Sequence, residues 1–280
     1  MNDIVLELDK TRMLLYADDM VIFYAHREFQ NIQDVLNNEF HRIGTWLLRN
    51  QLIINLKPGK TEAMLIGTPQ KLSKVPNLQV CLNGVEINTT EKYEYLGTVL
   101  DTSLNFKHHL DKMCKKATSR VKLLCRIRTF ISPHVAESIY SVMIRPLLLT
   151  CDVDTLLANS IQKKLQSVQN RCHKIVYGRK ANNCWKSIKT LCKEQVCLKV
   201  HKSLNGYCPD LYVGYFDKIE HHIRTRGNGK TIRLPRVRSE NGRKTFAFQG
   251  GLVFNDLPSK LATEKNFVSF KNSLKKHFDI

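Results

Sequence analysis

Short apolar runs separated by turn residues fill the first hundred residues of the chain. Two of these runs, residues 13–16 and 20–24, lie on either side of a pair of aspartates, which predicts a β-hairpin with the acids at its tip. Asn83-Gly84 lies between apolar residues and predicts a second hairpin over residues 81–86. Residues 52–54 and 63–66 predict two further short strands around a Pro-Gly turn.

Helical periodicity begins between these strands and dominates after residue 106. Residues 28–49 carry apolar side chains at three- and four-residue steps, so we expect an amphipathic helix that covers one face of the sheet. Ser132-Pro133 predicts the start of another helix, which Pro146 should kink or end. The remaining helical stripes fall in residues 110–125, 161–176, 185–200 and 267–278.

These patterns together predict an α+β protein in three parts. We expect a small antiparallel sheet with a covering helix in residues 1–105, a mostly helical region in residues 106–205, and a basic α+β module in residues 206–280. The final helix should dock on an aromatic-rich segment of that module. The expected core of the segment consists of Phe246, Phe248, Leu252 and Phe254.

The charge of the chain is strongly uneven. The formal net charge is +19, and residues 1–70 carry 7 basic and 9 acidic side chains, whereas residues 71–280 carry 37 and 16. Such a basic excess attracts polyanions through phosphate contacts and counterion release, which makes nucleic acid the leading class of partner. A solvated lysine-rich face and affinity for acidic lipid are the alternatives that charge alone leaves open.

Cysteine usage indicates a reducing compartment. The nine cysteines are scattered and odd in number, and no signal peptide precedes them, so we expect an intracellular protein of the nucleus or cytoplasm that is not secreted. One group of metal-ligand types, Cys192, Cys197, His201 and Cys208, has a spacing unlike that of zinc sites, which favours packing over zinc. No apolar run is long enough to span a bilayer.

The adjacent carboxylates of Asp18 and Asp19 are the candidate metal ligands. Mg²⁺ prefers oxygen ligands and is usually held by one or two carboxylates together with substrate phosphates, which suits an open hairpin tip. The neighbouring Ala17 is small enough to let the end of a nucleic acid approach. An acidic turn without function is the alternative interpretation of these residues.

Three motifs follow one another in order. A Y-A-D-D box occupies residues 16–19, L-x-x-N and K-T-x-x-M segments occupy residues 52–64, and a Y-L-G-x-x-x-D segment occupies residues 95–101. In this order and spacing, the chain resembles the reverse transcriptases of non-LTR (LINE-type, jockey-like) retrotransposons. Residues 1–4 are similar to the I-N-D-L stretch that precedes Y-A-D-D in that family. Residues 234–235, 254–258 and 267–271 resemble its C-terminal module.

The resemblance implies a fold and a chemistry for the three parts. They correspond to the second half of a polymerase palm, a helical thumb and a C-terminal module. The implied reaction is template-directed nucleotidyl transfer with magnesium ions, in which Asp18 is the stronger metal ligand and Asp19 the weaker.

The family also implies roles for two further segments. Lys60 matches a lysine that protonates or stabilises the pyrophosphate leaving group, although a lysine on a turn is more often simply solvated. Tyr95, Leu96 and Gly97 match a segment that grips the primer strand, where the glycine permits close backbone approach. A core strand with a glycine bulge is the alternative for that segment.

Two basic stretches are the candidate nucleic-acid surface. The first is the polar face of the helix after residue 106, with Lys115, Lys116, Arg120 and Lys122. The second is the glycine-containing segment over residues 222–244, where the planar guanidinium groups suit phosphate; a merely soluble loop is its alternative. The arginines of that segment are Arg224, Arg226, Arg233, Arg236 and Arg238.

The expected function follows from what the resemblance covers. In the family, the fingers and the aspartate that bridges both metals lie upstream of the I-N-D-L stretch, whereas this chain begins at Met1. We therefore expect a truncated RNA-directed DNA polymerase of a transposable element that is inactive alone, with an RNA template and a DNA primer or other nucleic acid as partners. A non-catalytic nucleic-acid-binding remnant and a reading frame without a useful product are the alternatives. The oligomeric state stays open.

Overall fold

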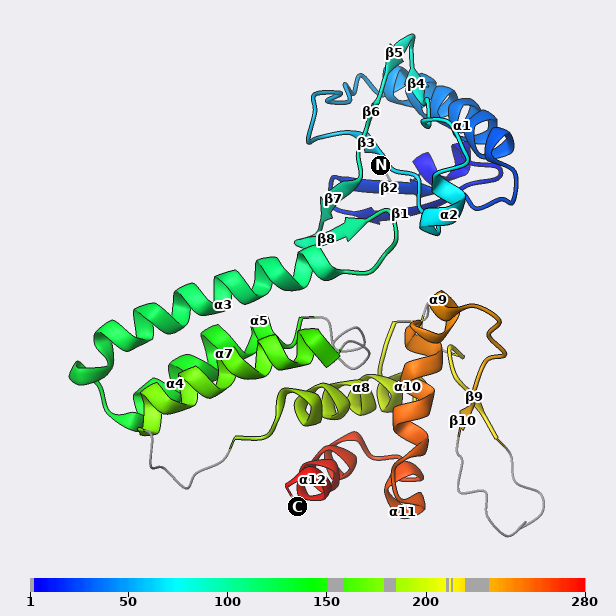
Figure 1. The fold of residues 1–280 in the computed structure, drawn as a ribbon. Helices are drawn as coiled ribbons and strands as arrows, with labels where there is room; N and C mark the ends of the chain where they lie inside the picture. The colour runs from blue at the N-terminus through cyan, green and yellow to red at the C-terminus, as the bar shows by residue number, and fades with distance from the viewer. Residues whose placement is uncertain are drawn as a thin grey trace. The chain divides into compact units, whose positions relative to one another are not determined.

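Residues 3–150, 159–178, 185–209, 212, 214–219 and 232–279 are described by a computed structural model. The chain divides into two compact units, Met1–His109 and Leu110–Ile280 (Figure 1). Helices mix with short two-stranded sheets in the described residues, which is the α+β class predicted from the sequence. The assignment of these parts as palm, thumb and C-terminal module, with boundaries at 105/106 and 205/206, stays a prediction.

A hairpin and one long helix form the base of the first unit. Strands β1 (Arg12–Tyr16) and β2 (Asp19–Phe23) pair antiparallel, and α1 spans Phe29–Arg49 after the short η1 (Ile4–Glu7). One face of the hairpin packs on the C-terminal half of α1, because strand side chains alternate between faces. The predicted hairpin and its covering helix are confirmed. The cluster includes Ile4, Met13, Leu15, Met20, Ile22, Ile43, Trp46 and Leu47.

The rest of the first unit consists of short ladders and one short helix, α2 (Pro69–Leu72). The predicted Asn-Gly hairpin is confirmed, with φ of 49° at Asn83 and 81° at Gly84. Residues 52–54 form no strand, and only Ala63 of residues 63–66 does, so these two strand predictions are wrong or too long. The ladders are β3 (Glu62–Ala63) with β6 (Asn88–Thr89) in parallel, and, antiparallel, β4 (Cys81–Leu82) with β5 (Val85–Glu86) and β7 (Lys92–Tyr95) with β8 (Thr98–Asp101).

Most of the second unit is helical. The predicted stripes correspond to α3, α7 and α8, whose apolar residues are largely buried. Between them lie shorter helical pieces. The elements are α3 (Lys107–Ile127), η2 (Arg128–Phe130), α4 (Pro133–Ile139), the π-helical η3 (Tyr140–Ile144), α5 (Arg145–Leu148), α7 (Asn159–Tyr177) and α8 (Ile188–Leu204).

Local sequence explains where α4 begins and how it is distorted. The Ser132 hydroxyl oxygen accepts a hydrogen bond from the backbone N–H of Val135, and Pro133 occupies the first turn, as predicted. Pro146 has no N–H to continue the helical ladder, and the π-helical η3 ends two residues before it. The helix then ends at Leu148, which confirms the predicted effect of the proline.

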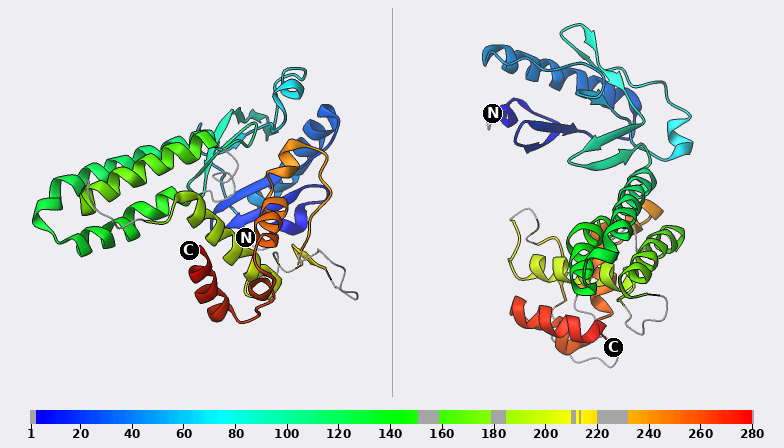
Figure 2. Two further views of the ribbon diagram at one scale, coloured as in Figure 1. Left: turned by 60° about the horizontal axis from the view of Figure 1, so that its bottom comes forward. Right: turned by 90° about the vertical axis from the view of Figure 1, so that its left-hand side faces the viewer.

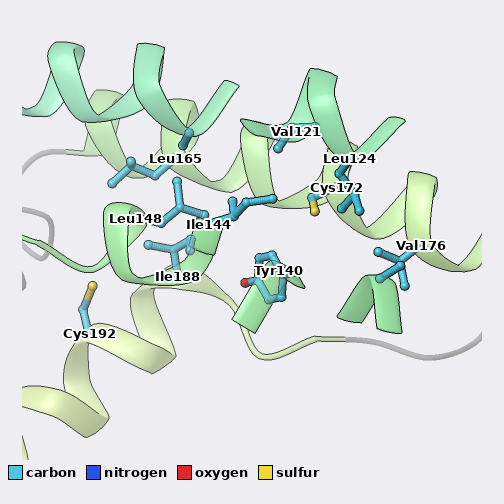
Figure 3. Close-up of a cluster of buried hydrophobic side chains, with 12 residues drawn as sticks. Val121, Leu124, Tyr140, Ile144, Leu148, Leu165, Cys172, Val176, Ile188 and Cys192 are labelled. Atoms are coloured by element: carbon cyan, nitrogen blue, oxygen red, sulfur yellow. The ribbon is translucent and has the colours of Figure 1, made fainter. Parts of the chain in front are cut away.

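One hydrophobic cluster joins α3, α4, η3, α5, α7 and the start of α8 (Figure 3). Tyr140 lies within this cluster and stacks on Trp185 with 3.7 Å between ring centroids. Its hydroxyl accepts a hydrogen bond of 2.9 Å from Gln169, which satisfies the buried oxygen. Burial raises the pKa of Tyr140 to about 12.

A second cluster forms the C-terminal part of the same unit. As predicted, the final helix α12 packs on α10 through Phe254, Phe270 and Leu274. Helix α8 also packs on α12, and Figure 2 shows these helices from two other sides. Leu252 is 41% exposed, so its predicted core position is wrong. The elements are β9 (Asp217–Lys218) paired with β10 (Ile232–Arg233), α9 (Glu240–Arg243), α10 (Phe246–Asn255), α11 (Ser259–Ala262) and α12 (Phe267–Phe278).

Within the described residues, every helix is too short or too polar to cross a membrane.

Candidate functional site

The two aspartates lie at the tip of the β1–β2 hairpin. Tyr16 pairs with Asp19 across the ladder, so Ala17 and Asp18 form the two-residue turn. Ala17 has a φ of 53°, in the left-handed region that primed hairpin turns require at their first central position. Asp18 and Asp19 are both exposed, so their carboxylates are open to a ligand.

Tyr93 on β7 connects this hairpin to a second segment. Its hydroxyl donates a hydrogen bond of 3.0 Å to the backbone carbonyl of Lys60. Burial raises the pKa of Tyr93, and the negative charges of Asp19 and Glu62 raise it further. Tyr93 is therefore hydrogen-bonded to the backbone of Lys60 and lies close enough to Asp19 to feel its charge, although the three residues come from separate segments of the chain.

The turn that carries Lys60 is held by hydrogen bonds to Glu62. The carboxylate of Glu62 accepts from the backbone N–H of Gly59 at 2.8 Å and from the side-chain amide of Asn88 at 3.1 Å. Gly59 has a φ of 82°, which suits a residue without a side chain. The Lys60 side chain is exposed.

Tyr95, Leu96 and Gly97 form the end of the β7–β8 hairpin. Tyr95 pairs with Thr98, so Leu96 and Gly97 are the turn residues, with φ of 46° and 79°. The interpretation of this segment as a core strand with a glycine bulge is therefore wrong. Leu96 is 49% exposed, and its role in gripping a primer stays a prediction.

The number of acidic side chains at the hairpin tip bears on magnesium binding. Among the described residues, no three His, Cys, Asp or Glu side chains gather closely enough to hold an ion on their own. Mg²⁺ needs only one or two protein carboxylates when phosphates and waters complete its shell. Asp18 and Asp19 supply that number of exposed carboxylates.

The cysteines and histidine of α8 are packing residues. Cys192 belongs to the first hydrophobic cluster and Cys197 to the second. The ring of His201 stacks on Phe270 with 4.0 Å between centroids. Burial raises the pKa of the Cys197 thiol to about 12, which opposes the thiolate that zinc binding requires.

The polar face of α3 presents the first predicted basic surface. Its four predicted residues are exposed: Lys115, Lys116, Arg120 and Lys122. Arg120 donates a hydrogen bond to the backbone carbonyl of Met143, so its guanidinium also fastens α3 to η3. Lys115 and Lys122 line a hollow of about 550 Å³ on the same helix.

The second predicted surface is described only in part. Arg233 lies in β10, opposite Asp217 of β9, and Arg236 and Arg238 follow before α9. All three side chains are exposed. Arg224 and Arg226 lie outside the described residues, so the proximity of the five arginines stays a prediction.

Sequence reasoning missed two groups of residues. Tyr93 and Glu62 support the site, and Tyr93 could have been found because strand alternation places it on the same face as Tyr95. The other group is a basic, aromatic groove between α8 and α12 with Lys202 and Phe267. Residues 202 and 267 are far apart in sequence, so no local pattern signals their approach.

Comparison with known proteins gives no match to this chain among family models, curated proteins or solved structures.

Proposed function

We propose that this chain contributes the carboxylate hairpin and part of the nucleic-acid surface to a reverse transcriptase of the non-LTR retrotransposon type. The supporting observation is Tyr93, whose hydroxyl bonds the backbone of Lys60 and whose pKa is raised in part by the charge of Asp19. Lys60 and Asp19 belong to two of the segments that the resemblance marks as functional. The exposure of Asp18 and Asp19 leaves both carboxylates accessible to a phosphate-bound metal.

The chemistry assigned to these residues is limited to binding and positioning. Asp18 and Asp19 would hold Mg²⁺, which when bound activates a primer hydroxyl and stabilises a leaving phosphate. The ammonium group of Lys60 would attract the leaving pyrophosphate. Tyr93 is a positioning residue, because its hydrogen bond fixes the backbone that carries Lys60. The partners are an RNA template and a DNA primer.

Nucleic-acid binding without catalysis is the second candidate function. It is favoured by the charge of residues 71–280, which carry 37 basic and 16 acidic side chains. It is favoured also by the exposure of the basic residues on α3 and around β10. Binding of this kind weakens steeply as salt rises, because phosphate contacts release counterions.

Metal binding at the hairpin tests the first proposal. We expect Mn²⁺, titrated in the presence of a primed RNA and followed by electron paramagnetic resonance, to bind more weakly to the Asp18→Asn/Asp19→Asn variant. Asp34→Asn is the matched control, because Asp34 is exposed on α1 away from the turn. Equal Mn²⁺ affinity in the wild type and the double variant would refute the metal site.

Primer extension separates the two candidate functions. We expect the chain alone to incorporate no dNTP on primed RNA with Mg²⁺ or Mn²⁺, because the described residues bring only the Asp18–Asp19 pair to the hairpin tip. Incorporation that Asp18→Ala abolishes would show a complete polymerase site in this chain. Nucleic-acid affinity that does not change between low and physiological salt would exclude the second candidate.

A further inference from the structure

A groove of about 690 Å³ lies between α8 and α12 in the second unit. The two helices pack through the second hydrophobic cluster, and the groove follows their exposed edges. Arg145 at the start of α5 closes one side. Residues from α8 and α12 supply most of the remaining lining: Leu191, Glu194, Gln195, Leu198, Lys199, Lys202, Phe267, Lys271 and Lys275.

The groove carries a positive excess. Six of its lining residues are basic and two, Glu194 and Asp279, are acidic. Both acids contact the same cation, since Lys186 Nζ lies 3.3 Å from Glu194 Oε2 and 2.8 Å from Asp279 Oδ1. The acidic charge is thus gathered around Lys186, and Lys202, Lys271 and Lys275 present positive charge along the rest of the groove.

Aromatic side chains lie beside these lysines. Lys202 Nζ is 5.0 Å from the centroid of the Phe267 ring, a cation–π arrangement at the groove wall. Tyr207 is 53% exposed, and its ring lies 6.0 Å from that of Phe267 and 6.3 Å from that of His201. Tyr207 therefore lies beside the groove wall, outside the lining itself, with about half of its side chain open to solvent.

We propose that this groove binds single-stranded nucleic acid, with a base stacked on Tyr207 and Phe267 and the phosphates held by Lys202, Lys271 and Lys275. Aromatic faces next to a basic track are the combination that sequence-tolerant single-strand binding uses. A duplex keeps its bases stacked inside and could use only the lysines. The inference adds a binding site to the nucleic-acid surface of the proposed function and rests on that function for its class of partner, but none of these residues belongs to the metal site.

The test compares a fluorescent 15-nucleotide RNA strand with a 15-base-pair duplex by anisotropy. Tyr207→Leu should weaken single-strand binding about 5- to 150-fold, the range for one lost stacked base, and should leave duplex binding unchanged. Tyr207 is exposed, so folding should survive, and circular dichroism checks this. Phe267→Leu is the second variant, because it keeps an apolar side chain on the partly buried wall.

The lysines are tested with a charge-matched control. The Lys202→Gln/Lys271→Gln/Lys275→Gln variant should flatten the plot of log affinity against log salt by about two units for the single strand, about 0.7 for each lost contact. The control variant changes three exposed lysines outside the groove lining, Lys244, Lys260 and Lys265, to Gln and should change the slope less.

Three outcomes would overturn the inference. Equal loss of single-strand and duplex binding in Tyr207→Leu would remove the stacking role. An equal change of salt slope in the groove and control lysine variants would mean that the groove lysines act only through the overall charge of the protein. Competition by poly-glutamate or by anionic vesicles as strong as that by unlabelled RNA would assign the groove to another polyanion. The metal test compares Mn²⁺ affinity between the wild type and Asp18→Asn/Asp19→Asn and changes no groove residue, so failure of the metal site is distinguishable from failure of the groove.

Discussion

The carboxylate of Glu39 on α1 fixes the chain just before the β1–β2 hairpin. Its oxygens accept from the backbone N–H of Asp9 at 3.0 Å, from that of Lys10 at 3.3 Å and from the Thr11 hydroxyl at 3.0 Å. The residue is only 4% exposed, although carboxylates are rarely buried. The helix pattern of residues 28–49 gave no indication of this role, because its partners lie about 30 positions away in the chain.

Removal of this acceptor should destabilise the first unit. We expect Glu39→Ala to lower the free energy of unfolding by about 1–3 kcal/mol or more, because several donors lose their partner in a buried position. Urea unfolding followed by Trp46 fluorescence measures this in a Trp185→Phe background. Glu28→Ala is the control, since Glu28 precedes α1 and makes no side-chain cap. Similar midpoints for the two variants would assign Glu39 no structural role.

Among the elements, the β-hairpins show where sequence prediction succeeds. Asn83-Gly84 was recognised as a turn because both residue types tolerate positive φ. The β7–β8 turn places Leu96 at a φ of 46°, and leucine gives no turn signal. The sequence therefore marked residues 95–97 only through the resemblance, and their turn geometry was visible only in the structure.

Leu96 should therefore be replaceable with a gain in stability. We expect Leu96→Asn to stabilise the first unit by up to about 1 kcal/mol, because asparagine adopts positive φ at lower cost and the leucine side chain is about half exposed. Urea unfolding followed by Trp46 fluorescence measures the change. Gly97→Ala is the opposite control, since its φ of 79° should make the variant less stable. A less stable Leu96→Asn variant would contradict this account.

The final helix is an element for which the sequence predicted one partner and missed another. Its stripe correctly identified Phe270 and Leu274 as core residues, both of which are fully buried. The helix packs on α8 as well as on α10, because α8 supplies Val196 and Val200 to this cluster and Cys192 to the other. Because α8 is buried on two sides, its sequence shows no single apolar stripe. The contact between α12 and α8 could therefore not be predicted from periodicity.

Loss of the Phe270 ring should destabilise the second unit. Its ring stacks on His201 at 4.0 Å and on Phe254 at 6.0 Å. We expect Phe270→Ala to reduce the free energy of unfolding by about 3–5 kcal/mol, the usual cost of such a cavity. Trp185 fluorescence during urea unfolding measures it in a Trp46→Phe background. Val268→Ala on the same helix is the control, because Val268 is 64% exposed; an equal effect would be inconsistent with the packing described.

At the scale of the whole chain, the sequence predicted the charge and the fold class better than it predicted which elements pack together. The basic excess and the α+β class followed from the sequence, and basic residues on α3 and near β10 are exposed as expected. The neighbourhood of Tyr93 and the groove between α8 and α12 depend on contacts between distant segments. Periodicity identifies elements but not which of them meet, so these features required the structure.

The stability of the second unit at high pH depends on several acidic groups buried in its two hydrophobic clusters. Burial raises the pKa of Tyr140, Cys172 and Cys197 to about 12, from ordinary values of 10.0 for tyrosine and 9.0 for cysteine. The folded state therefore favours the neutral forms. This contribution is fully present below about pH 9 and is lost as pH rises from about 9 to 12, because the unfolded chain releases these protons first.

We expect the free energy of unfolding to fall by a few kcal/mol between pH 8 and pH 11, since each unit of pKa shift corresponds to about 1.4 kcal/mol. Urea unfolding followed by circular dichroism at fixed salt measures the slope. Cys172→Ala should make the curve shallower, because it removes one buried acid, whereas Cys125→Ala should not, because Cys125 is exposed. A curve for the wild type that stays level up to pH 11 would mean that these groups ionise in the folded state near their ordinary pKa.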